Sequence, residues 1–101
     1  MTIFRGPTWQ TMLGKSAPEL LKQVIGLEET VLTDGALPIK IKTLMMMLCD
    51  ALLAHPEGVA NIAKRARALG ASENEITETV AVAFLMGGMP GLVTGANAFR
   101  D

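Results

Sequence analysis

The chain has 101 residues, which fits one domain, and a formal net charge of −1. That charge is too small to indicate a nucleic-acid partner or an anionic membrane surface. Apolar residues make up 50% of the chain and aromatic residues 4%, so the core must be aliphatic and rich in methionine. Because so small a domain cannot hide this much apolar surface alone, we expect a homo-oligomer.

Cys49 is the one cysteine of the chain. It cannot form an internal disulfide or a multi-cysteine metal site. Nothing at the N-terminus resembles a signal peptide, so we expect a cytoplasmic location. The longest apolar run, residues 44–54, contains Asp50 and is shorter than the roughly 20 residues that a bilayer span requires. We therefore place this run in a protein core and expect no membrane partner.

Residues 1–15 are predicted to form an N-terminal arm, with one helical turn over residues 8–13 and Trp9 as a candidate anchor. Ser16 to Glu19 fits a capping box with proline in the first turn. Apolar residues at helical spacing follow, from Leu20 to Val31, and Asp34-Gly35 ends this helix. Residues 16–101 are predicted to form one helical domain.

Pro38 opens a second helix that runs to about residue 54. It is apolar on almost every face beyond Thr43, which predicts burial on several sides. Pro56 opens a third helix that Gly70 caps. A capping box at residues 72–75 starts a fourth helix, which breaks at residues 87–90, and a short fifth helix follows. No segment alternates like a strand, so the predicted fold is all-α with about five helices.

Three segments of this pattern resemble the carboxymuconolactone decarboxylase and alkyl hydroperoxidase D-like (AhpD-like) superfamily. They are DGALPIKIKTL at residues 34–44, LGASENEI at residues 69–76 and MGGMP at residues 86–90. The likeness covers residues 19–100. It implies a small helical subunit that assembles into trimers or hexamers, in agreement with the composition.

The redox branch of this superfamily uses a C-x-x-C-x-x-x-H motif at a helix start, with a glutamate from the preceding helix. When the chain is aligned on Leu44 and Gly70, the two cysteine positions fall on His55 and Gly58. The histidine position falls on Ile62 and the glutamate position on Thr43. Glycine and isoleucine carry neither electrons nor protons, so the resemblance argues against thiol peroxidase chemistry here.

Cys49 lies six residues before His55, the first cysteine position of the motif. It falls within the apolar helix, where burial makes a thiol inert. We therefore predict a structural, buried cysteine. The alternative is a peroxidase-type activity through this single thiol, which would require an external reductant.

The decarboxylase branch is expected to use acid–base groups, commonly a histidine, to handle a lactone carboxylate. His55 is the only histidine and lies at a helix junction, where an imidazole can titrate near neutral pH. Asp50, among apolar neighbours, is a second candidate acid or base. The alternatives are a polar residue at a helix end for His55, and a solvent contact or an ion pair with lysine or arginine for Asp50. No second histidine or carboxylate cluster has metal-ligand spacing, so a metal site at His55 would need ligands from other subunits. We predict no metal and no cofactor.

The remaining polar and glycine positions suggest structural roles. Lys40 and Lys42 match a basic pair of the family and are predicted to be solvated, as is the basic group of residues 64–67, whose alternative is an anionic partner. Met45 to Met47 are predicted to pack in the core or an interface. Glycines at positions 87, 88, 91 and 95 are predicted to permit the helix break and close helix approach.

Two hypotheses from different classes follow. In the first, the chain is an enzyme of this superfamily. It acts on a small lactone, acid or peroxide in a pocket between the second and third helices and a neighbouring subunit, with His55, Asp50 or Cys49 carrying the chemistry. In the second, it is a non-catalytic oligomer that holds a small-molecule ligand or a partner.

Overall fold

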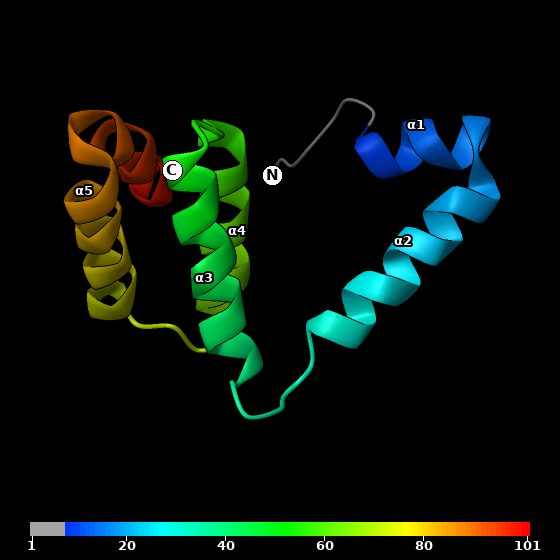
Figure 1. Ribbon diagram of the computed structural model, residues 1–101, viewed down its shortest axis with the longest axis horizontal. Helices are drawn as coiled ribbons and strands as arrows, with labels where there is room; N and C mark the ends of the chain where they lie inside the picture. The colour runs from blue at the N-terminus through cyan, green and yellow to red at the C-terminus, as the bar shows by residue number, and fades with distance from the viewer. Residues whose placement is uncertain (1–7) are drawn as a thin grey trace. The chain divides into compact units, whose positions relative to one another are not determined.

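The computed structural model describes residues 8–101, which form helices joined by short loops and contain no strand (Figure 1). The predicted all-α fold is confirmed for this part of the chain. The elements, in chain order, are α1 (Trp9–Ser16), α2 (Pro18–Val31), α3 (Ile39–Leu52), α4 (Pro56–Ala68), α5 (Glu73–Gly95) and the 3-10 helix η1 (Ala96–Phe99).

The N-terminal helices differ from the prediction. Thr8 caps α1 by accepting from the Thr11 N–H, and α1 continues through Ser16, where we expected one turn of helix and then a capping box. Ser16 caps nothing, since α2 begins at Pro18 with Ala17 as its N-cap and no side-chain cap. The break falls at Ala17 because the residue before a proline is driven out of the helical region. Residues 1–7 of the predicted arm lie outside the described residues.

Contacts divide the described residues into two compact units, with the boundary between Thr33 and Asp34. This division falls after α2, whereas we predicted that the arm ends at residue 15. No described residue of α1 or α2 is buried, and Trp9 is exposed, so in the single chain it does not act as the expected anchor.

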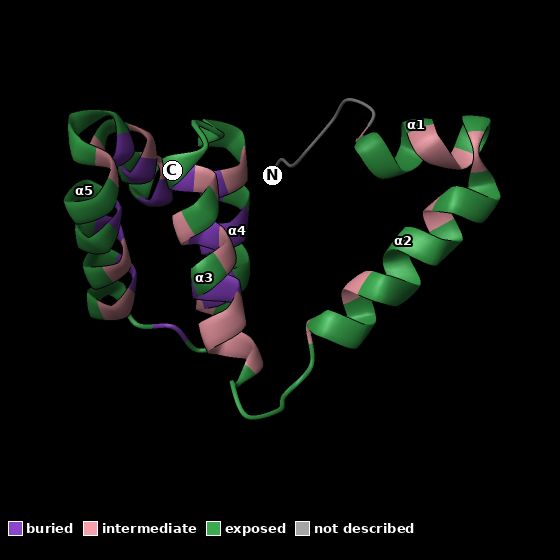
Figure 2. Ribbon diagram, in the orientation of Figure 1, coloured by how far each residue is buried: buried purple, intermediate pink, exposed green. Residues whose placement is uncertain are grey.

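The second unit contains the core. Figure 1 shows α4 running back beside α3, and α3 also packs against α5. The residues buried between these helices are aliphatic apart from Thr43 (Figure 2). The largest fully buried side chains are Met47, Ile76, Val59 and Thr43. Several alanines are among the buried residues, and η1 contacts α4 and contributes the buried Ala98.

The prediction that α3 is buried on several sides is wrong for the single chain. Its buried residues are Thr43, Leu44, Met47 and Ala51, which share one face at helical spacing. Met45 lies outside that face and is exposed. A uniformly apolar helix has no polar side to mark its outward face, and the sequence pattern therefore overstated its burial.

The break predicted at residues 87–90 is present inside α5. Gly88 adopts φ 66° and ψ −157°, and Pro90 follows within the helix. Among the described residues, the segment Glu73–Phe99 is long and apolar enough to cross a membrane by length and composition. The break at Gly88 leaves residues 73–87 as the longer straight part, about 22 Å at 1.5 Å per residue, which is shorter than the roughly 30 Å hydrocarbon core.

Candidate functional site

The end of α3 places His55 over Asp50. The His55 N–H donates to the Asp50 carbonyl at 2.9 Å, and the Leu53 N–H donates to Cys49. Ala54 between them adopts φ 62°, so the helix ends with alanine at the left-handed position that is common at helix C-termini. This reversal brings Nδ1 of His55 to 3.0 Å from Oδ1 of Asp50. Two of the three candidate residues therefore meet.

Gly58 completes the group from the first turn of α4. A Cβ atom built on Gly58 would lie 2.7 Å from Cγ of Asp50, closer than side chains pack. The Asp50 carboxylate thus occupies the space that any other residue at position 58 would fill. The side chain of Asp50 is 25% exposed and that of His55 is 58% exposed, so solvent reaches the pair.

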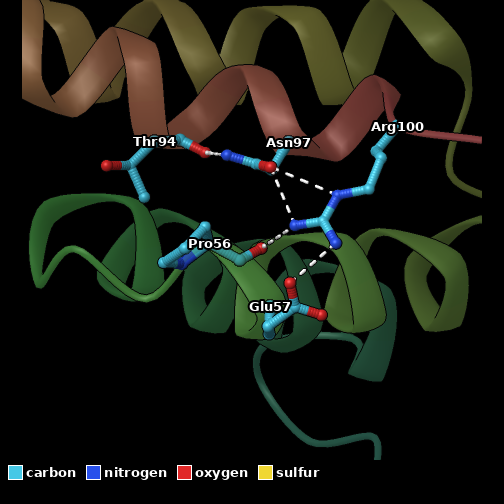
Figure 3. Close-up of polar contacts among 5 residues, drawn as sticks. All are labelled: Pro56, Glu57, Thr94, Asn97 and Arg100. Atoms are coloured by element: carbon cyan, nitrogen blue, oxygen red, sulfur yellow. Dashed lines mark hydrogen bonds and ion pairs between the residues drawn. The ribbon is translucent and has the colours of Figure 1, made fainter.

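An arginine near the C-terminus holds the start of α4 (Figure 3). The Arg100 guanidinium donates to the Glu57 carboxylate at 2.7 Å and to the Pro56 carbonyl at 3.3 Å. It also donates to Asn97, whose amide group donates to the Thr94 carbonyl. Sequence reasoning missed Arg100. No motif links it to Glu57 and Pro56, which precede it by 43 and 44 positions. Glu57 is therefore an ion-pair partner and not a second free carboxylate beside His55.

The other two positions of the redox motif belong to the core. Thr43 is 1% exposed, and its hydroxyl donates to the Ile39 carbonyl within the same helix at 2.8 Å. Ile62 is buried in the aliphatic cluster. Neither residue reaches the Asp50–His55 pair through a described contact, so the four positions separate into two core residues and two residues that contact Asp50.

The prediction that Cys49 is buried is wrong for the single chain, where the thiol is exposed. Successive residues of a helix are rotated by about 100°, which turns position 49 away from the buried face that Met47 and Ala51 share. Among the described residues, Cys49 has no side-chain hydrogen bond or ion pair with an acid or base. The structure therefore brings together His55 and Asp50 but not Cys49.

Basic residues that were predicted to be solvated instead form two ion pairs. Lys40 Nζ lies 3.0 Å from Glu75 Oε2. The Ser72 backbone N–H donates to Glu75 and, together with Lys40, lowers the pKa of that carboxyl below its ordinary value. Arg67 binds Glu73 through two hydrogen bonds of 2.7 and 2.9 Å. These bonds lower the pKa of Glu73 and raise the pKa of Arg67.

One hollow of the described residues lies within the first unit. It is lined by one helix, α2, through Pro18, Leu21, Lys22, Ile25, Gly26 and Glu29, and includes none of the candidate residues. Within residues 8–101, no group of three or more His, Cys, Asp or Glu side chains is arranged to hold a metal ion.

Comparisons with known proteins agree with this architecture. A family model described as carboxymuconolactone decarboxylase family matches residues 18–101. The apo crystal structure of a carboxymuconolactone decarboxylase family protein from Legionella pneumophila is similar, with a TM-score of 0.82 and 30% sequence identity. The match covers 88% of this chain and 80% of that one. No curated protein matches the chain. Since the family model covers most of the sequence, the chain belongs to the carboxymuconolactone decarboxylase family.

Proposed function

We propose that this protein is an acid–base enzyme acting on a small lactone or carboxylic acid, and that its chemistry does not pass through a thiol pair. The observation that carries the proposal is the 3.0 Å contact between His55 Nδ1 and Asp50 Oδ1 in a chain of this family. A histidine oriented by a carboxylate is a recurrent general acid or base.

Asp50 and His55 would have different roles in the reaction. Asp50 orients the imidazole, while the exposed ring accepts or donates the proton that the reaction moves. When a carboxylate leaves as carbon dioxide, the remaining carbon framework holds an electron pair that must be protonated, and the imidazolium of His55 would supply that proton. Glu57, bound to Arg100, keeps the start of α4 in place.

The direct test is turnover of carboxymuconolactone and a panel of related lactone acids by the purified protein. His55→Ala is expected to lower kcat/KM by about 10²- to 10⁴-fold, the usual contribution of a general acid or base. Asp50→Ala should give a smaller loss. The matched control is Cys49→Ser, since Cys49 neighbours Asp50 in sequence but does not contact the pair, and it should leave kcat/KM unchanged. Unchanged turnover in His55→Ala would refute the proposal.

A second candidate function is a non-catalytic oligomer that binds a small molecule or a partner. The observation that favours it is the burial of Thr43 and Ile62 in the core, which leaves two of the redox-motif positions without chemistry. It predicts no turnover of any panel member, together with saturable binding of one of them. Reproducible turnover that one point substitution abolishes would exclude it.

Peroxidase chemistry through Cys49 is the weakest of the three candidates, because the thiol has no described acid or base beside it to activate it. Peroxide consumption that Cys49→Ser abolishes would reinstate it. We further propose that the protein is a cytoplasmic homo-oligomer, a trimer or a hexamer. The exposed apolar side chains of both units support the oligomer, and a neighbouring subunit would complete the substrate pocket between α3 and α4.

A further inference from the structure

We infer that Gly58 is a positioning residue. The missing side chain at position 58 forms the seat for the Asp50 carboxylate, and the seated carboxylate fixes His55 in the tautomer that carries its proton on Nδ1. The inference deepens the proposed function, because the nitrogen left to accept a proton would then be Nε2. It assigns a role to a position that would otherwise count only as a lost cysteine.

The first step is the geometry of the seat. A Cβ at position 58 would meet the Asp50 carboxylate at Oδ2 first, then at Cγ (2.7 Å) and at Oδ1 (3.2 Å). Oδ1 is the atom that contacts His55, and the three carboxylate atoms move together. The obstructing atoms belong to the end of a side chain and not to the backbone. An added methyl group would therefore displace the carboxylate from His55 while leaving the packing of α3 against α4 in place.

The second step is the proton on the imidazole. An ionised carboxylate only accepts hydrogen bonds, so the 3.0 Å contact requires Nδ1 of His55 to donate. In the neutral ring this leaves Nε2 with the lone pair. Nε2 makes no hydrogen bond to any described residue, and the side chain is 58% exposed. The basic nitrogen is thus left open to a ligand.

The third step is the helix stability that is lost by having glycine at position 58. Gly58 lies in the first turn of α4 and has an ordinary negative φ, since the described glycines with positive φ are Gly70 and Gly88. Glycine is a poorer helix former than alanine at such a position. The backbone conformation therefore does not require glycine, whereas the position of Asp50 does.

The test is the tautomer of His55 in solution, read by long-range proton–nitrogen correlation NMR at about pH 9, above the ordinary imidazole titration range. His55 is the only histidine, so one imidazole pattern is observed. The wild type should show a protonated Nδ1. Gly58→Ala should shift the pattern toward that of an unrestrained histidine, as Asp50→Ala should. Gly26→Ala, a helical glycine with nothing within 4 Å of an added Cβ, should leave it unchanged.

A double substitution separates the seat from a general effect on folding. In the Asp50→Ala background the added methyl group meets no carboxylate, so Gly58→Ala should leave the His55 pattern unchanged and raise the melting temperature. If Gly58→Ala alone fails to fold, rescue by Asp50→Ala still supports the seat. Three outcomes would overturn the inference. The first is that both Gly58→Ala and the double variant fail to fold. The others are a wild-type His55 protonated on Nε2, and a His55 NMR pattern that Gly58→Ala does not change. None of these readouts uses a substrate, so absence of turnover would refute the proposed function without affecting the seat.

Discussion

Ala54 and Gly70 occupy equivalent positions at the ends of α3 and α4. Both have positive φ, 62° and 97°, and in each case the next N–H bonds back to the carbonyl five residues earlier. A residue with a Cβ pays for this conformation and glycine does not. Ala54→Gly is therefore expected to raise the free energy of unfolding by up to about 1 kcal/mol, and Gly70→Ala to lower it by about 1 kcal/mol. Urea unfolding monitored by circular dichroism gives both values, and a loss of stability in Ala54→Gly would contradict the assignment.

Glu73 and Glu75 are expected to contribute to the loss of stability at acid pH. Their pKa values are lowered in the folded state, so their stabilisation is complete above the unfolded pKa near 4.5. It is lost as the pH falls through the lower folded values. The combined variant Glu73→Gln, Glu75→Gln should lose less melting temperature between pH 6 and pH 3 than the wild type does. Glu78→Gln is the control, as an exposed glutamate of α5 without a described ion pair. Equal pH slopes in all three proteins would contradict the prediction.

The candidate site shows which residues sequence alone could identify. Asp50 and His55 stood out as polar groups near a helix junction, and both belong to the pair that the structure describes. Their contact depends on the left-handed conformation of Ala54. A glycine at this position would have predicted that conformation, but an alanine does not. The exposure of Cys49 depends on which face of α3 meets α5. The contact of Arg100 with the start of α4 depends on how the chain returns after Gly88. Such a long-range contact has no local signal in the sequence.

At the scale of elements, the packing of α5 against itself depends on glycine. Beyond the break at Gly88, a Cβ on Gly91 would lie 2.5 Å from the Ala83 carbonyl oxygen, which is backbone and cannot rotate away. Gly91→Ala should therefore lower the free energy of unfolding by about 1–3 kcal/mol, the usual cost of overpacking. Gly95→Ala is the matched control, because its nearest atom is a Val80 methyl group at 3.2 Å. Urea unfolding should show the smaller loss for Gly95→Ala, and equal losses would contradict the argument.

Most element boundaries followed from the sequence because their signals are local. Pro38, Pro56 and the capping box at Ser72 mark real helix starts, and both hydrogen bonds of that box are present. The signal at Ser16 failed because a preceding helix already extended through it. A capping residue acts only where the chain before it is non-helical, and the weak pattern of residues 9–16 predicted one turn of helix that ends before Ser16.

At the scale of the whole molecule, the exposed apolar surface is large for a chain with 19% charged residues. It includes five exposed apolar residues of α5 on either side of the break, namely Phe84, Leu85, Met86, Met89 and Val93. A large amount of exposed apolar surface is typical of interaction sites. The composition predicted this surplus, but it held no information on which faces would carry it, since that depends on how the helices pack.

Subunit association is the consequence that can be measured directly. Light scattering coupled to gel filtration should give a molar mass three or six times the subunit mass of 10.7 kDa. Leu85 is 77% exposed in the single chain, so Leu85→Lys should leave the fold intact by circular dichroism and lower the molar mass, because burying an unpaired lysine in an interface is costly. Asn74→Lys, an exposed polar position of the same helix, should leave the mass unchanged. A wild type that elutes at the subunit mass at every concentration would refute the oligomer, and an unchanged mass in Leu85→Lys would place the interface on other apolar residues.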